Sequence, residues 1–213
     1  ASPTTEPSWV DTLETLQSLS SSLSTASYIS VDVEFTAPHT SLLQLTTGGG
    51  SWLVDPYPLH SSLLPLLGRY FSDPAVPKIL HDCRRDCRWL LDDFGIHLAG
   101  VWDTFQAEGR LQEMGKSEGR RGYKDLCERH LGVSVDKSEQ SSDWSRRPLT
   151  RRQVLYAWSD TLNLKALMDA QAALLPASAV ADVEALCWSA VLGSSPPSIP
   201  ASSPPPPPPP PPP

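Results

Sequence analysis

The sequence predicts an α/β fold in which helices cover both faces of a central mixed sheet of five strands. Three short β-rich segments with turn residues between them come first, which is typical of an antiparallel meander. Helical segments and short apolar segments then alternate along the chain, as they do in sheets with helices on both faces. A chain of 213 residues is long enough to bury the core of one such domain.

The strands are recognised by their β-rich composition and by the turns between them. The first strand alternates apolar and polar side chains, and residues 37–40 form the turn that follows it. Gly48–Gly50 is the hairpin turn before the third strand. The last two strands are short apolar runs next to helices. The expected strands are 28–35, 41–46, 51–54, 77–81 and 97–102.

The helices are recognised by capping residues and by apolar residues at helical spacing. Asp11 or Thr12 caps the first helix, and Asp103 caps the fourth. Gly95 ends the third helix and Gly132 ends the fifth. The expected helices are 12–26, 61–71, 84–94, 103–114, 123–130, 151–175 and 180–191.

Composition divides the chain into three parts. Residues 1–8 are expected to be a flexible lead, 9–193 a single domain, and 194–213 a disordered proline-rich tail that ends in ten consecutive prolines. Such a run favours a stiff polyproline II rod, which is suited to partners of the SH3, WW or profilin type. A spacer without a dedicated partner is the alternative.

Composition also favours an intracellular protein, nuclear or cytoplasmic, with no membrane partner. There is no apolar run of membrane-spanning length, and the first residues show no signal-peptide pattern. The four cysteines lack the spacing of a zinc site and are interpreted as reduced thiols. The net charge is −7, but residues 116–152 hold ten basic against six acidic residues, which suits a phosphate backbone or a mixed solvated surface.

Two pairs of residues stand at spacings that chemistry can use. Asp32 and Glu34 lie two apart on a predicted strand and therefore point to the same face. Tyr156 and Asp160 lie one helical turn apart, a spacing that also occurs on ordinary surfaces. Carboxylates that converge repel each other, and a hard divalent cation with oxygen ligands relieves the repulsion. With Asp86 from a neighbouring helix, these residues predict a metal site.

The same residues lie in four segments that point to a family. In chain order these segments are VDVEF, HDCRRDCRWL, WDTFQA and GVSVDKSEQSSDWSRRPLTRRQVLYAWSD. Together they resemble the ribonuclease D type 3′–5′ exonucleases, the tyrosine-bearing subclass of the DEDD family, which includes the nuclear exosome-associated exonuclease. The resemblance covers about residues 9–170 and implies a ribonuclease H-like three-layer α/β/α fold.

The resemblance also implies a mechanism with two divalent cations, Mg²⁺ or Mn²⁺, and assigns roles to single residues. Asp32 would bridge the two ions, Glu34 and Asp160 would hold the ion that carries the attacking water, and Asp86 would act on the second ion. Tyr156 would hydrogen-bond the water. For three basic residues, contact with substrate phosphates and structural pairing both stay open; they are Lys137, Arg146 and Arg147.

The expected activity is hydrolysis from the 3′ end of single-stranded nucleic acid, releasing nucleoside 5′-monophosphates. RNA is favoured because DKSEQSSDWSRRPLT is nearer to ribonuclease D than to the DNA-editing members. A DNA 3′–5′ exonuclease is one alternative, and an inactive RNA-binding or scaffolding module of the same fold is another. The link from VDVEF to SLLQL is shorter than is usual in the family, which leaves the grip on the 3′ end open.

Overall fold

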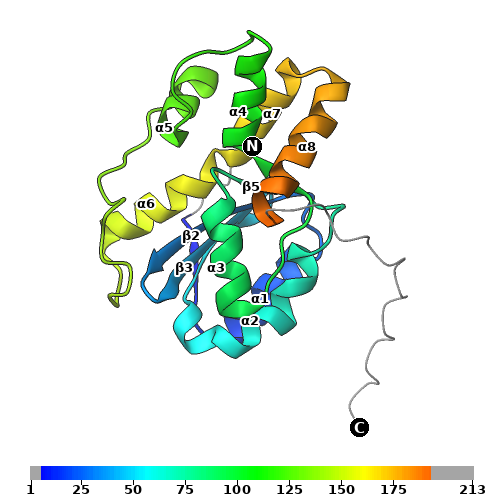
Figure 1. Cartoon of the computed structure of the whole chain (residues 1–213). Coiled ribbons are helices and arrows are strands. Elements are labelled where there is room, and N and C mark those ends of the chain that lie inside the picture. Colours follow the sequence, from blue (N-terminus) through cyan, green and yellow to red (C-terminus); the bar gives the residue numbers. More distant parts are fainter. Residues whose placement is uncertain (1–5, 193–213) are drawn as a thin grey trace, which may run out of the picture.

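The computed structural model of the chain describes residues 6–192, except the side chains of 184–185 and 188–192. A twisted sheet lies at its centre with helices on both faces (Figure 1). Along the sheet the strands follow the order β1-β4-β3-β2-β5-β6. They are β1 (Ser8–Val10), β2 (Ile29–Thr36), β3 (His39–Thr47), β4 (Gly50–Val54), β5 (Lys78–Leu80) and β6 (Val101–Asp103).

The predicted mixed α/β sheet is confirmed, but it has six strands instead of five. β2, β3 and β4 form the antiparallel meander, and β5 and β6 extend it in parallel beyond β2. The additional strand is β1, which pairs in parallel with β4 and begins at Ser8, inside the predicted lead. Three residues are too few to show a period-2 pattern, and their pairing partner lies more than forty residues away in the chain.

The helices begin and end largely where the capping residues predict. Thr12 caps the first helix in a capping box, and Asp103 accepts a hydrogen bond from the amide N of Phe105 at 2.9 Å. Gly95 ends α3 in the left-handed region at φ 69°. The helices are α1 (Leu13–Leu23), α2 (Pro56–Phe71), α3 (Arg84–Phe94), α4 (Thr104–Glu113), α5 (Tyr123–Leu126), the π-helical turn η1 (Cys127–Leu131), α6 (Arg151–Leu162), α7 (Leu164–Leu174) and α8 (Ala177–Leu192).

The long helix predicted for 151–175 is wrong in one respect, because it is two helices. Asn163 stands between α6 and α7 with φ −98° and ψ −3°, which ends one helix and begins the next. No Pro or Gly marks this break, so the helical pattern of the sequence runs through it. The break lets α6 cross the sheet while α7 turns away to pack on α4 and η1.

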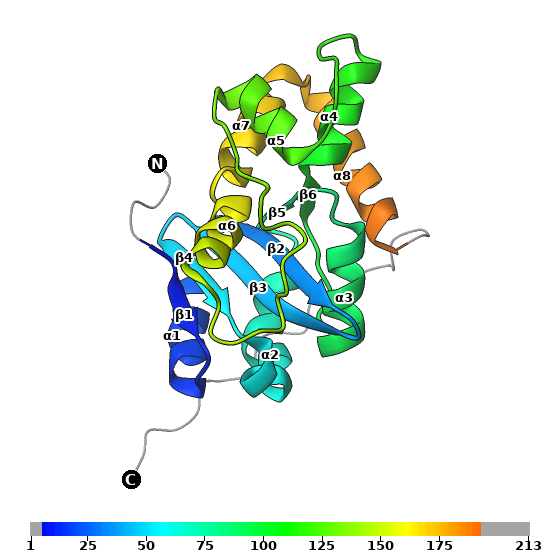
Figure 2. The ribbon, with the colours of Figure 1, turned by 90° about the vertical axis from the view of Figure 1, so that its left-hand side faces the viewer.

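The helices form layers on the two faces of the sheet. α6 crosses one face over β2, β3 and β4, as Figure 2 shows. α2 and α3 lie on the opposite face, and α1 packs on α2. α4, α7 and α8 pack together beyond β5 and β6. Within residues 6–192 no helix has the length and apolarity needed to cross a bilayer. The predicted tail, 194–213, lies outside the described residues.

Lys78 is a fully buried base on β5. Its ammonium donates hydrogen bonds to the backbone carbonyl oxygen atoms of Tyr70, at 3.3 Å, and of Asp73. Burial, which disfavours the charged form, lowers the pKa of Lys78 from 10.5 to about 8.

We expect this shifted pKa to appear in the pH dependence of stability. Between pH 8 and 10.5 the unfolded chain binds more protons at Lys78 than the folded chain does, so the free energy of unfolding rises with pH there. Across this window the wild type should gain about 2–3 kcal/mol relative to the Lys78→Met variant, which cannot titrate. Urea unfolding of both proteins from pH 7 to pH 10 measures this difference. If the free energy of unfolding changes with pH in the same way in both proteins, the pKa of Lys78 is not lowered.

Candidate active site

The first two carboxylates of the site come from the central strand β2. Asp32 and Glu34 pair across the antiparallel ladder with Gln44 and Leu42 and point to the same face of the sheet. A β-bulge follows between Glu34 and Phe35, close to the point where β2 turns into β3. Bulges bend a strand locally. Although the connection after Glu34 is short, both carboxylates lie close to Asp160 of α6, which packs on β2.

The third carboxylate comes from α6, which crosses that face. Asp160 is 8% exposed, and its carboxylate oxygen lies within 4.8 Å of those of Asp32 and Glu34. Lys137 donates a hydrogen bond from its Nζ to Oδ1 of Asp160 at 2.8 Å. The prediction that acids distant in the chain converge therefore holds for these three residues.

Asp86 faces the same pocket from the first turn of α3. It is 7% exposed and lines the pocket together with Asp32, Glu34 and Asp160. It stands outside the group of three carboxylates that lie within 4.8 Å of one another. The structure therefore brings Asp86 to the pocket but not into the close group of carboxylates.

Burial and crowding raise the pKa values of these carboxylates. Burial, and then the charge of Asp160, raises the pKa of Asp32 to about 7. Burial, and then the charges of Asp32 and Asp160, raises the pKa of Glu34 to about 9. Burial also raises the pKa values of Asp86 and Asp160, against the opposing effect of Lys137 on Asp160. Such a cluster of oxygen donors with unfavourable mutual repulsion fits a hard divalent cation.

Tyr156 lies one helical turn before Asp160 on the buried side of α6. The residue is 6% exposed, and its ring packs against that of Trp144 at 5.8 Å between centroids. Burial, followed by the negative charge of Asp160, raises the pKa of the Tyr156 hydroxyl. The phenol therefore keeps its proton at neutral pH and acts as a hydrogen-bond donor. Trp144 is a buried core residue.

The three basic residues singled out in the sequence have different surroundings. Lys137 lines the pocket, with its Nζ 5.2 Å from the centre of the Tyr156 ring. Arg147 is engaged in structural pairing: its guanidinium donates to both carboxylate oxygens of Asp55, at 2.6 and 3.0 Å. Arg146 is exposed and does not line this pocket. Of the three, only Lys137 is at the carboxylate site.

The pocket has a volume of about 500 Å³ and includes residues that sequence reasoning did not select. Trp89 follows Asp86 by three positions, a spacing that places it on the same helical face. Asp82 also lines the pocket and adopts a positive φ of 55°. The other lining residues that sequence reasoning did not select are Val33, Arg85, Phe105, Gly122, Tyr123, Lys124 and Gln140. Phe105, Tyr123, Lys124 and Gln140 are distant in sequence from the selected carboxylates and reach the pocket through the tertiary fold.

His81 lies in the pocket wall in a neutral form. Its Nδ1 lies 2.9 Å from the hydroxyl of Thr104, which donates its own proton to the carbonyl oxygen of Leu80 at 3.1 Å. His81 Nδ1 therefore carries the hydrogen of this contact. Burial, and then the charge of Lys137, lowers the pKa of His81 to about 4. These contacts make His81 a packed, hydrogen-bonding residue of the pocket wall.

Fold and site together define the class of α/β proteins that hold divalent cations in a carboxylate cluster above a mixed sheet. The family described as 3′-5′ exonuclease matches residues 7–173 of this chain. Because this match covers most of the chain, the protein belongs to the 3′–5′ exonuclease family, and the resemblance noted in the sequence is confirmed. The family depends on divalent metal ions, in agreement with the donor set.

Individual relatives support this assignment. The chain is 33% identical to ribonuclease D of Acidiphilium cryptum over 165 residues, which are 75% of this chain and 41% of the relative. The catalytic core of RRP6 from Trypanosoma brucei is similar with a TM-score of 0.78 and 28% identity, over 85% of this chain and 50% of that one. Escherichia coli RNase D, an exoribonuclease involved in structured RNA processing, is similar with a TM-score of 0.75 and 27% identity. The match covers 89% of this chain and 50% of that one. The chain thus spans about half the length of these relatives or less.

We expect Asp32→Asn to stabilise the metal-free protein at alkaline pH. Because the folded pKa of Asp32 is raised to about 7, stability falls as pH rises from about 4 through 7, and the whole penalty is present at pH 8. Asn removes the charge but keeps the shape, so the melting temperature in chelator at pH 8 should rise by about 10 °C. The gain should shrink towards pH 5.

Asp55→Asn is the matched control for this measurement. Asp55 is a buried carboxylate that is paired with Arg147, so its neutralisation should lower the melting temperature. Added Mg²⁺ should raise the melting temperature of the wild type and of Asp55→Asn but have a much smaller effect on Asp32→Asn. Equal melting of Asp32→Asn and wild type at pH 8 would show that the carboxylates are not crowded.

Proposed function

We propose that the protein is a metal-dependent 3′–5′ exonuclease that hydrolyses phosphodiester bonds from the 3′ end of nucleic acid and releases nucleoside 5′-monophosphates. One observation carries the proposal: Asp32, Glu34 and Asp160 lie within 4.8 Å of one another, with Tyr156 one turn before Asp160. Membership of the 3′–5′ exonuclease family supports the same activity.

The four carboxylates are the residues that would hold the metal. Asp32, Glu34 and Asp160 would hold one divalent cation, and Asp86, which lines the same pocket, would contribute to a second. Mg²⁺ and Mn²⁺ both suit such oxygen donors. When bound, such cations supply a nucleophilic hydroxide at neutral pH and neutralise charge on the reacting phosphate.

Tyr156 and Lys137 act beside the carboxylates in this proposal. The protonated hydroxyl of Tyr156 donates a hydrogen bond to the attacking water and fixes its line of approach to phosphorus. Lys137 Nζ, now 2.8 Å from Asp160, neutralises that carboxylate and is close enough to the pocket to contact a substrate phosphate. Arg147 is committed to Asp55, so we assign it no substrate contact.

We propose single-stranded RNA as the substrate. Two of the most similar proteins are named ribonuclease D and an exoribonuclease, which favours RNA over DNA. The five catalytic residues proposed here are all present, which disfavours an inactive scaffolding module; they are Asp32, Glu34, Asp86, Tyr156 and Asp160.

The proposal also includes an intracellular location, nuclear or cytoplasmic, where RNA 3′ ends occur. Residues 9–193 would act as the catalytic domain. The tail 194–213 would be a separate segment that is not required for catalysis.

The activity is tested with 5′-labelled and 3′-labelled oligonucleotides of RNA and DNA, incubated with Mg²⁺, Mn²⁺ or chelator. We expect RNA to be shortened stepwise from its 3′ end, with a mononucleotide as the first labelled product of the 3′-labelled strand. Chelator should stop the reaction. Internal cleavage, or shortening from the 5′ end, would refute the assignment.

We expect Tyr156→Phe to lower the single-turnover rate by about 10²–10⁴-fold, the usual contribution of a group positioned on a proton in transfer. The ring and its packing on Trp144 survive the change, so the free energy of unfolding should change by about 1 kcal/mol or less. Single-turnover kinetics at saturating metal and thermal melting measure the two effects.

Tyr57→Phe provides the control, because Tyr57 is 45% exposed and lies outside the pocket. Its rate should equal that of the wild type. If Tyr156→Phe cleaves within about threefold of the wild type, Tyr156 has no role in the chemistry.

A further inference from the structure

The outer wall of the pocket is basic, whereas its interior is acidic. Residues 115–124, which we call the arm, run from the end of α4 into α5 and hold four basic residues and one acidic residue. Gly122, Tyr123 and Lys124 of the arm line the pocket, as does Arg85 on α3. Among the described residues no carboxylate forms an ion pair with Arg85 or with Arg121 of the arm.

Arg121 has a defined place on this wall. Its guanidinium lies over the ring of Phe105, 4.2 Å from the ring centre, and Phe105 itself lines the pocket. Arg121 is half-buried and is not among the lining residues, so it adjoins the pocket through Phe105. A guanidinium on an aromatic ring keeps its donors free for an anion, because the cation–π contact uses only one face.

Gly109 on α4 makes room for Arg121 in this position. A Cβ at residue 109 would collide with Nη1 of Arg121, the far end of a flexible side chain. Glycine inside a helix costs stability relative to alanine, and here its replacement would displace the guanidinium. Gly109 and Phe105, one turn apart on α4, thus form the surface against which the Arg121 guanidinium packs.

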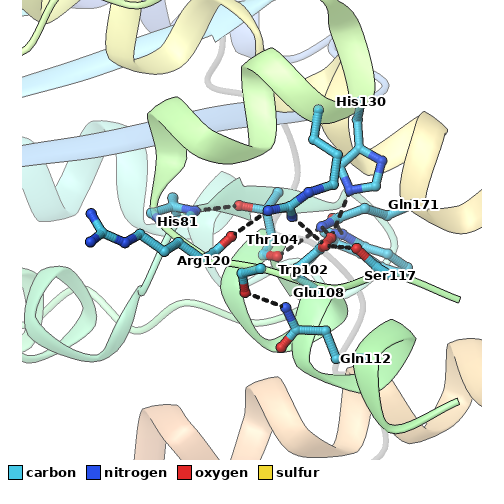
Figure 3. Close-up of polar contacts among 11 residues, drawn as sticks. His81, Trp102, Thr104, Glu108, Gln112, Ser117, Arg120, His130 and Gln171 are labelled. Atoms are coloured by element: carbon cyan, nitrogen blue, oxygen red, sulfur yellow. Dashed lines mark hydrogen bonds and ion pairs between the residues drawn. The ribbon is translucent and has the colours of Figure 1, made fainter. Parts of the chain in front are cut away.

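The backbone just before Arg121 is anchored to a buried carboxylate. Glu108 is 0% exposed and accepts hydrogen bonds from Ser117 and from Arg129, His130 and Gln171 at 2.7, 2.7 and 3.1 Å; Figure 3 shows this group. Arg129 also donates to the carbonyl oxygen of Arg120 at 2.8 Å.

A second hydrogen bond from outside the arm holds its backbone two residues before Arg121. Gln112 donates to the carbonyl oxygen of Gly119 at 2.8 Å. The arm is therefore held at 117, 119 and 120, so Arg121 is presented from a fixed backbone.

We propose that Arg121 is a substrate-positioning residue that binds a backbone phosphate upstream of the nucleotide in the carboxylate pocket. The inference rests on the proposed function, because it assumes that a nucleic acid 3′ end occupies that pocket. A positive groove that tracks the backbone, combined with aromatic side chains, is the common design of single-strand binding. Arg121 supplies the charge at a fixed position, and Lys124 and Arg85 extend the positive wall towards the carboxylates.

The test measures equilibrium binding of the full chain to a 5′-fluorescent RNA of eight nucleotides and to a dinucleotide. All variants carry Asp32→Asn to prevent hydrolysis, and a gel confirms that the RNA stays intact. Arg121→Met removes the charge, Gly109→Ala displaces the guanidinium without removing it, and Arg120→Met, an exposed neighbour, controls for general charge. Affinity is measured at several salt concentrations.

We expect Arg121→Met and Gly109→Ala to weaken binding of the eight-nucleotide RNA about tenfold. Loss of one phosphate contact should also reduce the slope of log affinity against log salt by about 0.7. The dinucleotide, which ends before the upstream phosphate, should bind within about twofold of the parent protein, and Arg120→Met should bind both ligands as the parent does.

Three results would overturn the inference: unchanged affinity of Arg121→Met, an equal loss in Arg120→Met, or a Gly109→Ala variant that binds as the parent does. If the parent protein binds no RNA at all, the proposed function fails instead. Thermal melting confirms that each variant is folded, and Gly109→Ala should melt no lower than the parent, because alanine is the better helix former.

Discussion

The crowding of three carboxylates between β2 and α6 is the constraint on which the rest of the structure depends. Asp32, Glu34 and Asp160 repel one another, and folding brings them within 4.8 Å nonetheless. The packing of α6 across β2, β3 and β4 provides the opposing free energy, and the ammonium of Lys137 offsets part of the charge. A site held in an unfavourable arrangement by its surroundings is prepared for a cation, since little reorganisation remains when one binds.

Much of the site could be predicted from the sequence, because its spacing rules are local. Asp32 and Glu34 share a face through the period of a strand, and Tyr156 and Asp160 through one turn of a helix. β1 and the break at Asn163 could not be predicted, because one depends on a partner strand distant in the chain and the other carries no breaker residue. For Arg147, pairing and substrate contact looked alike in the sequence, and only the tertiary position of Asp55 separates them.

The two walls of the pocket are supported by separate parts of the fold. The carboxylate wall depends on the central strand and on α6, whose position is fixed by the sheet. The basic wall depends on the arm, which is tied through Glu108 to α4, η1 and α7, beyond β5 and β6. Under the proposed function, substitutions in the arm would therefore alter which nucleic acids are bound while leaving the carboxylate cluster intact.

The short strand β1 has a consequence at the far edge of the sheet. Its three residues cover the outer side of β4, and Trp9 within it lies 5.5 Å from the guanidinium of Arg147. Without these residues, β4 would present unpaired amide and carbonyl groups to solvent, which is a template for strand pairing between molecules. A shortened version that starts after Val10 would keep every carboxylate of the pocket and yet tend to self-associate. The presence of β1 should therefore affect the solubility of the protein at high concentration, independently of the carboxylate pocket.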